Sequence, residues 1–85
     1  MKVLIPSALR SYTENSRVEA SGATLAQLLI DLDRQYPGIR FRMIDEQHCV
    51  RRHIRIFING EQVSALSRSL ADTDDVAIVQ ALTGG

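Results

Sequence analysis

Residues 52–60, RHIRIFING, encode a strand and the turn that reverses it, which is the clearest structural signal in the chain. Two sets of residues alternate along it, as in a strand with one face on a core: Ile54, Ile56 and Ile58 on one side, and His53, Arg55 and Phe57 on the other. Asn59-Gly60 favours a type I′ turn, because both central positions of that turn need positive φ. We therefore expect a hairpin whose return strand is Glu61–Val63.

Residues 24–36 carry the spacing of an amphipathic helix. Thr24 is suited to be its N-cap, and Gln27 stands three residues on, in the capping-box position. Apolar residues follow at i, i+3, i+4, i+7 and i+11, which places them on one helical face: Leu25, Leu28, Leu29, Leu32 and Tyr36. Pro37 and Gly38 predict the end of the helix, since proline disfavours a helical residue before it.

The other apolar runs predict three more strands, at Lys2–Pro6, Arg17–Ala20 and 75–82. The first two are expected to pair as a hairpin around a loop at Ser7–Ser16. In residues 39–50, Ile39, Met43 and Ile44 could sit on a short helical turn, but no period is sustained. Residues 64–75 predict a polar connector, with Leu66 and Leu70 turned inward.

Composition and charge exclude several classes of protein. The chain has 85 residues and equal numbers of basic and acidic residues, so it lacks the basic excess of a general nucleic-acid binder. Its single cysteine, Cys49, allows no internal disulfide and suits a reducing compartment. The apolar start is too short for a signal peptide, and no apolar run reaches the ~20 residues that span a bilayer. We therefore expect a cytoplasmic protein that binds neither nucleic acid nor membrane.

The order of elements predicts an α+β fold: hairpin, helix, hairpin, last strand and tail. Such an order gives a mixed sheet packed on one main helix. Residues 1–82 are expected to form one domain, and residues 83–85, Thr83-Gly84-Gly85, a flexible tail. Glycine has no Cβ, so a Gly-Gly end can enter a narrow channel and present its carboxylate to another protein.

Together these segments resemble the small ubiquitin-like β-grasp sulfur carriers of the MoaD/ThiS family. The matching segments span nearly the whole chain: residues 2–6, Thr24-Leu25 with Leu28-Leu29, residues 36–39, residues 53–61, residues 74–79, and the final Gly84-Gly85. The length and the Tyr36-Pro37-Gly38 helix exit are more like the carriers for cysteine synthesis and molybdopterin synthesis than the shorter thiamine carrier. The resemblance implies the β-grasp fold.

The resemblance also implies a reaction at Gly85. An ATP-dependent activating enzyme would adenylate its carboxylate, and a sulfur donor would then displace AMP to leave a thiocarboxylate, so that the chain ends in 1-thioglycine. A second enzyme, a sulfur-accepting synthase, would use that sulfur. Gly84 and Thr83 would thread through the partner sites. On this reading the chain is a co-substrate without catalytic residues or a bound cofactor.

A docking surface for these partners is expected on the sheet. If Val76 and Ile78 face the helix, the alternate residues of the last strand face outward, and an apolar patch beside a functional tail suggests docking. The candidate residues are Phe57, Ala77, Val79 and Leu82, together with Arg55. Arg51, Arg52 and Arg55 also form a basic cluster that could steer an acidic partner.

Other chemistry is weakly supported. His48, Cys49 and His53 match no established zinc spacing and lack a fourth ligand. Cys49 has no organising base beyond these histidines. The acidic residues Asp72, Asp74 and Asp75 are typical of a solvated turn, and the serines Ser64, Ser67 and Ser69 lack a triad context.

Several alternatives stay open. Cysteine synthesis is favoured as the destination of the sulfur, with molybdopterin, another sulfur metabolite or tRNA thiolation as alternatives. A ubiquitin-like modifier that joins Gly85 to lysines would use the same adenylation step. A binding module with an incidental Gly-Gly end is the third hypothesis. A gene could also encode residues after Gly85 that a peptidase removes.

Overall fold

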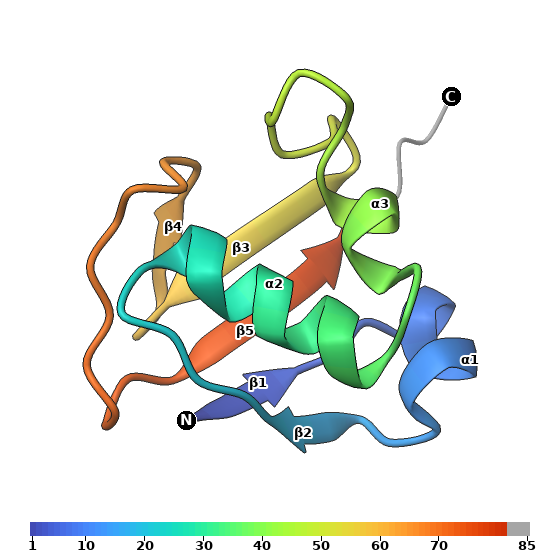
Figure 1. Cartoon of the computed structure of the whole chain (residues 1–85), viewed down its shortest axis with the longest axis horizontal. Coiled ribbons are helices and arrows are strands. Elements are labelled where there is room, and N and C mark those ends of the chain that lie inside the picture. Colours follow the sequence, from blue (N-terminus) through green and yellow to red (C-terminus); the bar gives the residue numbers. More distant parts are fainter. Residues whose placement is uncertain (82–85) are drawn as a thin grey trace.

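One mixed sheet forms the body of the protein in this computed structural model, which describes residues 1–81. The strand order is β2-β1-β5-β3-β4. β5 lies in the middle, parallel to β1 on one side and antiparallel to β3 on the other, as Figure 1 shows. The strands are β1 Lys2–Leu4, β2 Arg17–Glu19, β3 Ile54–Ile58, β4 Glu61–Val63 and β5 Val76–Gln80. Two antiparallel hairpins joined through the central strand β5 give the β-grasp topology that the element order and the family resemblance implied.

The main helix, α2, crosses one face of this sheet (Figure 1). Three shorter helical segments lie beside it. The bounds are η1 Ser7–Leu9, a 3₁₀ turn, α1 Arg10–Thr13, α2 Leu25–Gln35 and α3 Ile39–Met43. No helix in the described part of the chain is long and apolar enough to cross a membrane.

The start of α2 follows the sequence prediction with one difference. The Thr24 hydroxyl accepts the Gln27 amide at 3.3 Å, as an N-cap does. The Gln27 side chain accepts the amide of Ala23 at 3.0 Å, one residue before the cap, where a capping box would use the cap's own amide. Gly22 allows the chain to pass close to the helix, because a Cβ there would meet the backbone nitrogen of Leu28 at 2.4 Å.

The core fills the space between α2 and the sheet. The four leucines of the predicted helical stripe are fully buried: Leu25, Leu28, Leu29 and Leu32. On the sheet side of the core, the isoleucines of β3 are buried, as are Val76 and Ile78 of β5. The strand parity predicted from RHIRIFING and from the last strand is therefore confirmed. Leu66 and Leu70 are half-buried and pack against this core.

The β3–β4 turn takes the predicted left-handed conformation, with φ 52° at Asn59 and 85° at Gly60. The Asn59 side chain also ties the turn to the start of β5. Its amide group donates to Asp74 at 2.9 Å, and its oxygen accepts the Asp75 amide at 2.9 Å. The turn thus fixes β4 and positions β5 as well.

The loop expected at Ser7–Ser16 is wrong, because η1 and α1 occupy most of it. These two turns are held by tertiary contacts, with Leu9 and Thr13 buried. The backbone then leaves α1 through Glu14 at φ 61°. Residues 39–50, which showed no period, contain α3 and a bridge between Ile44 and Val50.

Candidate functional site

The central strand β5 leads the chain to one end of the sheet. It is hydrogen-bonded on both sides, to β1 and β3. The Ala81 amide continues the pairing one residue beyond the strand by donating to the His53 carbonyl oxygen at 2.7 Å. The backbone is therefore fixed by the sheet up to residue 81. The residues expected to thread into partners, Thr83 and Gly84, and the residue expected to react, Gly85, lie outside the described residues. Leu82, expected to belong to the docking surface, lies outside them as well.

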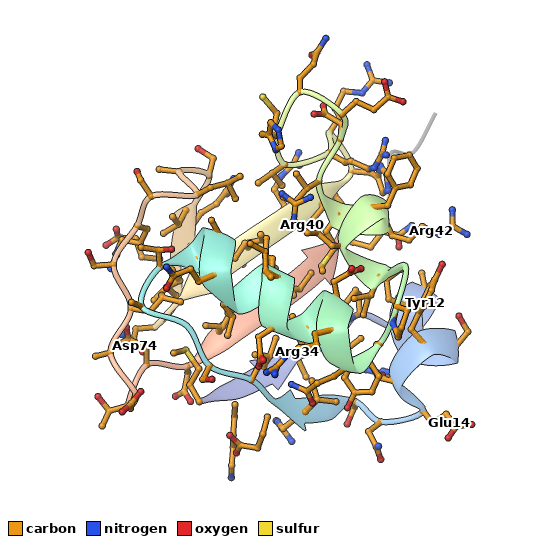
Figure 2. The ribbon with its side chains drawn as sticks, in the orientation of Figure 1. Tyr12, Glu14, Arg34, Arg40, Arg42 and Asp74 are labelled. Atoms are coloured by element: carbon orange, nitrogen blue, oxygen red, sulfur yellow. The ribbon has the colours of Figure 1, made fainter. Side chains whose placement is uncertain are left out.

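A groove of about 420 Å³ opens where β5 ends. It is built from four parts of the chain: the η1–α1 segment, α3, the residues that lead into the start of β3, and the end of β5. Its polar and aromatic lining includes Tyr12, Phe41, Arg42, Arg51, His53 and Gln80. Figure 1 shows β5 ending next to α3, and Figure 2 shows Tyr12 and Arg42 together on this side of the molecule.

Two arginines in this groove are held by their Nε atoms. Nε of Arg42 donates to the Tyr12 hydroxyl at 3.1 Å. Nε of Arg51 donates to the Phe41 carbonyl oxygen at 2.7 Å, and its guanidinium lies 4.6 Å from the centre of the Phe41 ring. Such a stacked cation is attracted by the negative face of the ring.

The sheet face opposite α2 carries the predicted docking residues. One row of outward-facing residues crosses all the strands through the observed register: Arg17, Leu4, Ala77, Phe57 and Gln62. Phe57 and Ala77 are half-buried, whereas Val79 is 40% exposed and lies opposite Arg55. Leu4, Phe57 and Ala77 help to line a hollow of about 430 Å³ on this face. The face is therefore apolar at its centre and polar at its edges.

Arg55 does not extend from this face as a free charge. Its Nη1 donates to the carbonyl oxygens of Arg52 and Ile54. Arg51 joins the groove instead. The basic cluster read from the sequence is therefore divided between two surfaces.

The histidines and the cysteine do not form a metal site. Among residues 1–81 no group of three or more His, Cys, Asp or Glu side chains is placed to hold a metal. His48 sits in a turn at φ 63°, Cys49 is exposed beside it, and His53 lines the groove.

Two carboxylates stabilise turns by accepting backbone amides. Asp45 accepts the amides of Cys49 at 3.0 Å and Gln47 at 2.9 Å, and the bond from Cys49 is the main reason that its pKa lies below the usual value. Asp74 accepts the Ala71 amide at 2.8 Å, and this bond together with Asn59 lowers its pKa. The acidic run is thus structural at Asp74. Ser64, Ser67 and Ser69 are exposed on the connector between β4 and β5.

Sequence reasoning missed most of the groove and one residue of the sheet face. Tyr12 comes from a different segment of the chain than Phe41 and Arg42, and none of the three belongs to a motif. Phe41 could have been singled out from the sequence, because it is a large aromatic residue outside any apolar period. In the structure Phe41 is 57% exposed. Leu4 could have been assigned to the open face of the sheet from the alternation along the strand, because Val3 and Ile5 on either side of it are buried.

Comparison with known proteins agrees with this architecture along the whole chain. A family model described as "ThiS family" matches residues 3–85. The sulfur carrier protein CysO of Mycobacterium tuberculosis is 37% identical over 89 residues, covering 98% of this chain and 96% of that protein.

Solved structures show the same fold. A chain of the BexX/CysO complex from Amycolatopsis orientalis is 33% identical with a TM-score of 0.90, covering 99% of this chain and 98% of that one. The small archaeal modifier protein 1 from Methanosarcina acetivorans is 26% identical with a TM-score of 0.81, covering 99% of this chain and 94% of that one. The first likeness places a carrier of this fold in a protein complex, and the second extends the fold to a modifier.

Proposed function

Because this chain belongs to the ThiS family and is a sulfur carrier of the CysO type, we propose that it carries sulfur as a thiocarboxylate on Gly85. The observation that supports this best is the family match through residue 85, which includes the glycine pair. As a carrier the protein is a co-substrate, and the catalysis belongs to its partners.

The proposed reaction has two steps. The Gly85 carboxylate attacks the α-phosphorus of ATP in the activating enzyme, which forms an acyl-adenylate and releases pyrophosphate. A sulfide-level donor then attacks the acyl carbon, so that a C–S bond forms and the C–O bond to AMP breaks. The product is a thiocarboxylate, a nucleophile that a sulfur-accepting synthase can use. Because the activation step consumes ATP, we place the protein in the cytoplasm.

The geometry up to residue 81 supports delivery of a tail. The sheet holds the backbone of β5 on both sides, and the bond from Ala81 to His53 holds it to the last described residue. A rigid end to the folded part limits the positions that the following residues can reach, which reduces the entropy lost when a partner binds them. In this proposal residues 1–82 are the folded domain, residues 83–85 are the tail, and Thr83 and Gly84 pass through the partner's channel.

The open sheet face is proposed as the docking surface. Phe57, Ala77 and Val79 form its apolar part, with Leu82 following along the chain and Arg55 at its edge. The proposed partners are the ATP-dependent activating enzyme and a sulfur-accepting synthase, with a peptidase needed only if the gene encodes residues after Gly85. Cysteine synthesis is the favoured destination of the sulfur, because the relative at 37% identity is the carrier CysO.

Intact-mass spectrometry tests this function. The protein is incubated with ATP, sulfide and the cognate activating enzyme. A mass gain equal to the difference between sulfur and oxygen, located on Gly85 by fragmentation of the C-terminal peptide, supports the carrier. An unchanged mass with an enzyme of verified activity contradicts it.

A ubiquitin-like modifier is the second candidate, because a modifier protein shares this fold at 26% identity. The amine of a target lysine would attack the acyl carbon of the adenylate, so that an isopeptide bond forms, the C–O bond to AMP breaks and AMP leaves. The same incubation distinguishes the two functions if a cell extract is added, since a modifier gives covalent adducts that resist reducing agents.

A further inference from the structure

We propose that the groove at the end of β5 binds an acidic segment of the partner protein that receives the tail. This inference rests on the proposed function and adds a partner chemistry to it. The groove lies beside Ala81, the last residue that the structure describes, because Gln80 lines it and the carbonyl oxygen of His53, another lining residue, accepts the Ala81 amide. A partner that binds the residues after Ala81 would therefore lie next to the groove.

The charge of the groove is positive. Arg42 and Arg51 line it, and none of the described residues that line it is acidic. This local excess contrasts with a formal net charge of zero for the chain. The charge of Arg51 contributes to lowering the pKa of Asp45. The Asp45 carboxylate, however, accepts the amides of Gln47 and Cys49 in its own loop. The groove thus keeps a charge that complements carboxylates.

The two guanidiniums are pre-organised for this role. Each is fixed through Nε, Arg42 by Tyr12 and Arg51 by the Phe41 carbonyl. Among residues 1–81 neither arginine forms an ion pair, and no hydrogen bond uses their terminal nitrogens. These nitrogens can form the paired N–H donors that bind a carboxylate with two bonds. Fixing the side chains beforehand reduces the entropy lost on binding.

The shape favours a peptide over a single small anion. The groove measures about 420 Å³, and its two arginines come from separate segments of the chain. Phe41 is 57% exposed at the groove and adds an apolar surface between polar groups. Aromatic and arginine side chains together are typical of the residues that dominate protein interfaces. An acidic segment with an apolar side chain among its carboxylates fits this combination.

Kinetics of the activating enzyme test the inference. We expect Arg42→Gln/Arg51→Gln to raise the KM for the carrier in ATP–pyrophosphate exchange by roughly tenfold, with kcat within about twofold, because the lost contacts act in binding. The KM of the variant is also expected to depend less on salt than that of the wild type. Arg42→Lys/Arg51→Lys keeps the charge without the paired donors, so its KM is expected to fall in between.

The matched control is Arg34→Gln/Arg68→Gln, which removes the same charge from two exposed ion pairs remote from the groove. Its KM is expected to equal that of the wild type. Thermal unfolding of both double variants checks that each retains the wild-type fold. The inference is overturned if the groove variant matches the control in KM and in salt dependence.

A probe that needs no enzyme separates this inference from the proposed function. Deca-glutamate is titrated into ¹⁵N-labelled protein, with deca-glutamine as the neutral reference. We expect deca-glutamate alone to shift the amides of residues 42, 51, 53 and 80, and these shifts to vanish in Arg42→Gln/Arg51→Gln. Shifts that are scattered over the surface or persist in the variant overturn the groove. If the shifts are present but the wild type is not adenylated, the proposed function is overturned and the inference about the groove stands.

Discussion

Asp74 joins the turn before β5 to the turn after β3, because its carboxylate accepts both the Ala71 amide and the Asn59 side chain. These bonds favour the ionised form, so the pKa of Asp74 is lower in the folded protein than its usual value of 3.8. A group with a depressed pKa stabilises the fold above its unfolded pKa, and this contribution is lost as the pH falls through the folded pKa.

We therefore expect Asp74→Asn to lower the thermal midpoint at about pH 7, where the carboxylate is charged in both states. The difference from the wild type is expected to shrink as the pH is lowered below the usual pKa of 3.8. Thermal unfolding by circular dichroism across this range measures it. Asp72→Asn, on an exposed neighbour, is the control. A difference that is the same at neutral and acidic pH would refute the assigned role.

At the scale of the element, α2 depends on its leucine stripe, which is fully buried against the sheet. Leu28→Ala or Leu29→Ala is expected to cost roughly 2–5 kcal/mol in the free energy of unfolding, because the packed site cannot fully close over the lost volume. Urea denaturation measures this loss. Ile30→Ala on the same helix is the control, since Ile30 is 56% exposed. Equal losses for the buried and the exposed positions would show that the helix face is misassigned.

The sequence predicted all five strands and α2, and its strongest signals were a long period and a strict turn. α2 repeats its apolar spacing along the helix, and β3 alternates up to an Asn-Gly turn. η1 and α1 were missed because two short turns cannot show a period, and burial of Leu9 and Thr13 stabilises them only in the fold. The groove was missed for a related reason: its residues meet only when four separate segments of the chain pack together.

At the scale of the whole molecule, one face of the sheet packs on α2 and the other supplies the proposed docking surface. Val79→Asp places a charge on that open face, where a 40% exposed side chain can remain hydrated. We expect a thermal midpoint close to that of the wild type and a weaker affinity for the activating enzyme, measured by calorimetry. Ile78→Asp, on the buried face of the same strand, is the contrast and is expected to unfold the protein. Normal affinity with Val79→Asp would place the docking surface elsewhere.

Formation of the acyl-adenylate tests the central claim, that the Gly85 carboxylate is the reacting group, most directly. The measurement compares ATP–pyrophosphate exchange for the wild type and for a chain that lacks Gly84 and Gly85. Deletion moves the terminal carboxylate back to Thr83, whose branched side chain is expected to clash in the proposed channel that accepts glycine. The buried residues that the structure describes lie between Val3 and Ile78, so the truncated chain is expected to keep its thermal midpoint. We predict a folded protein that is not adenylated, whereas adenylation of the truncated chain at the wild-type rate would contradict the account.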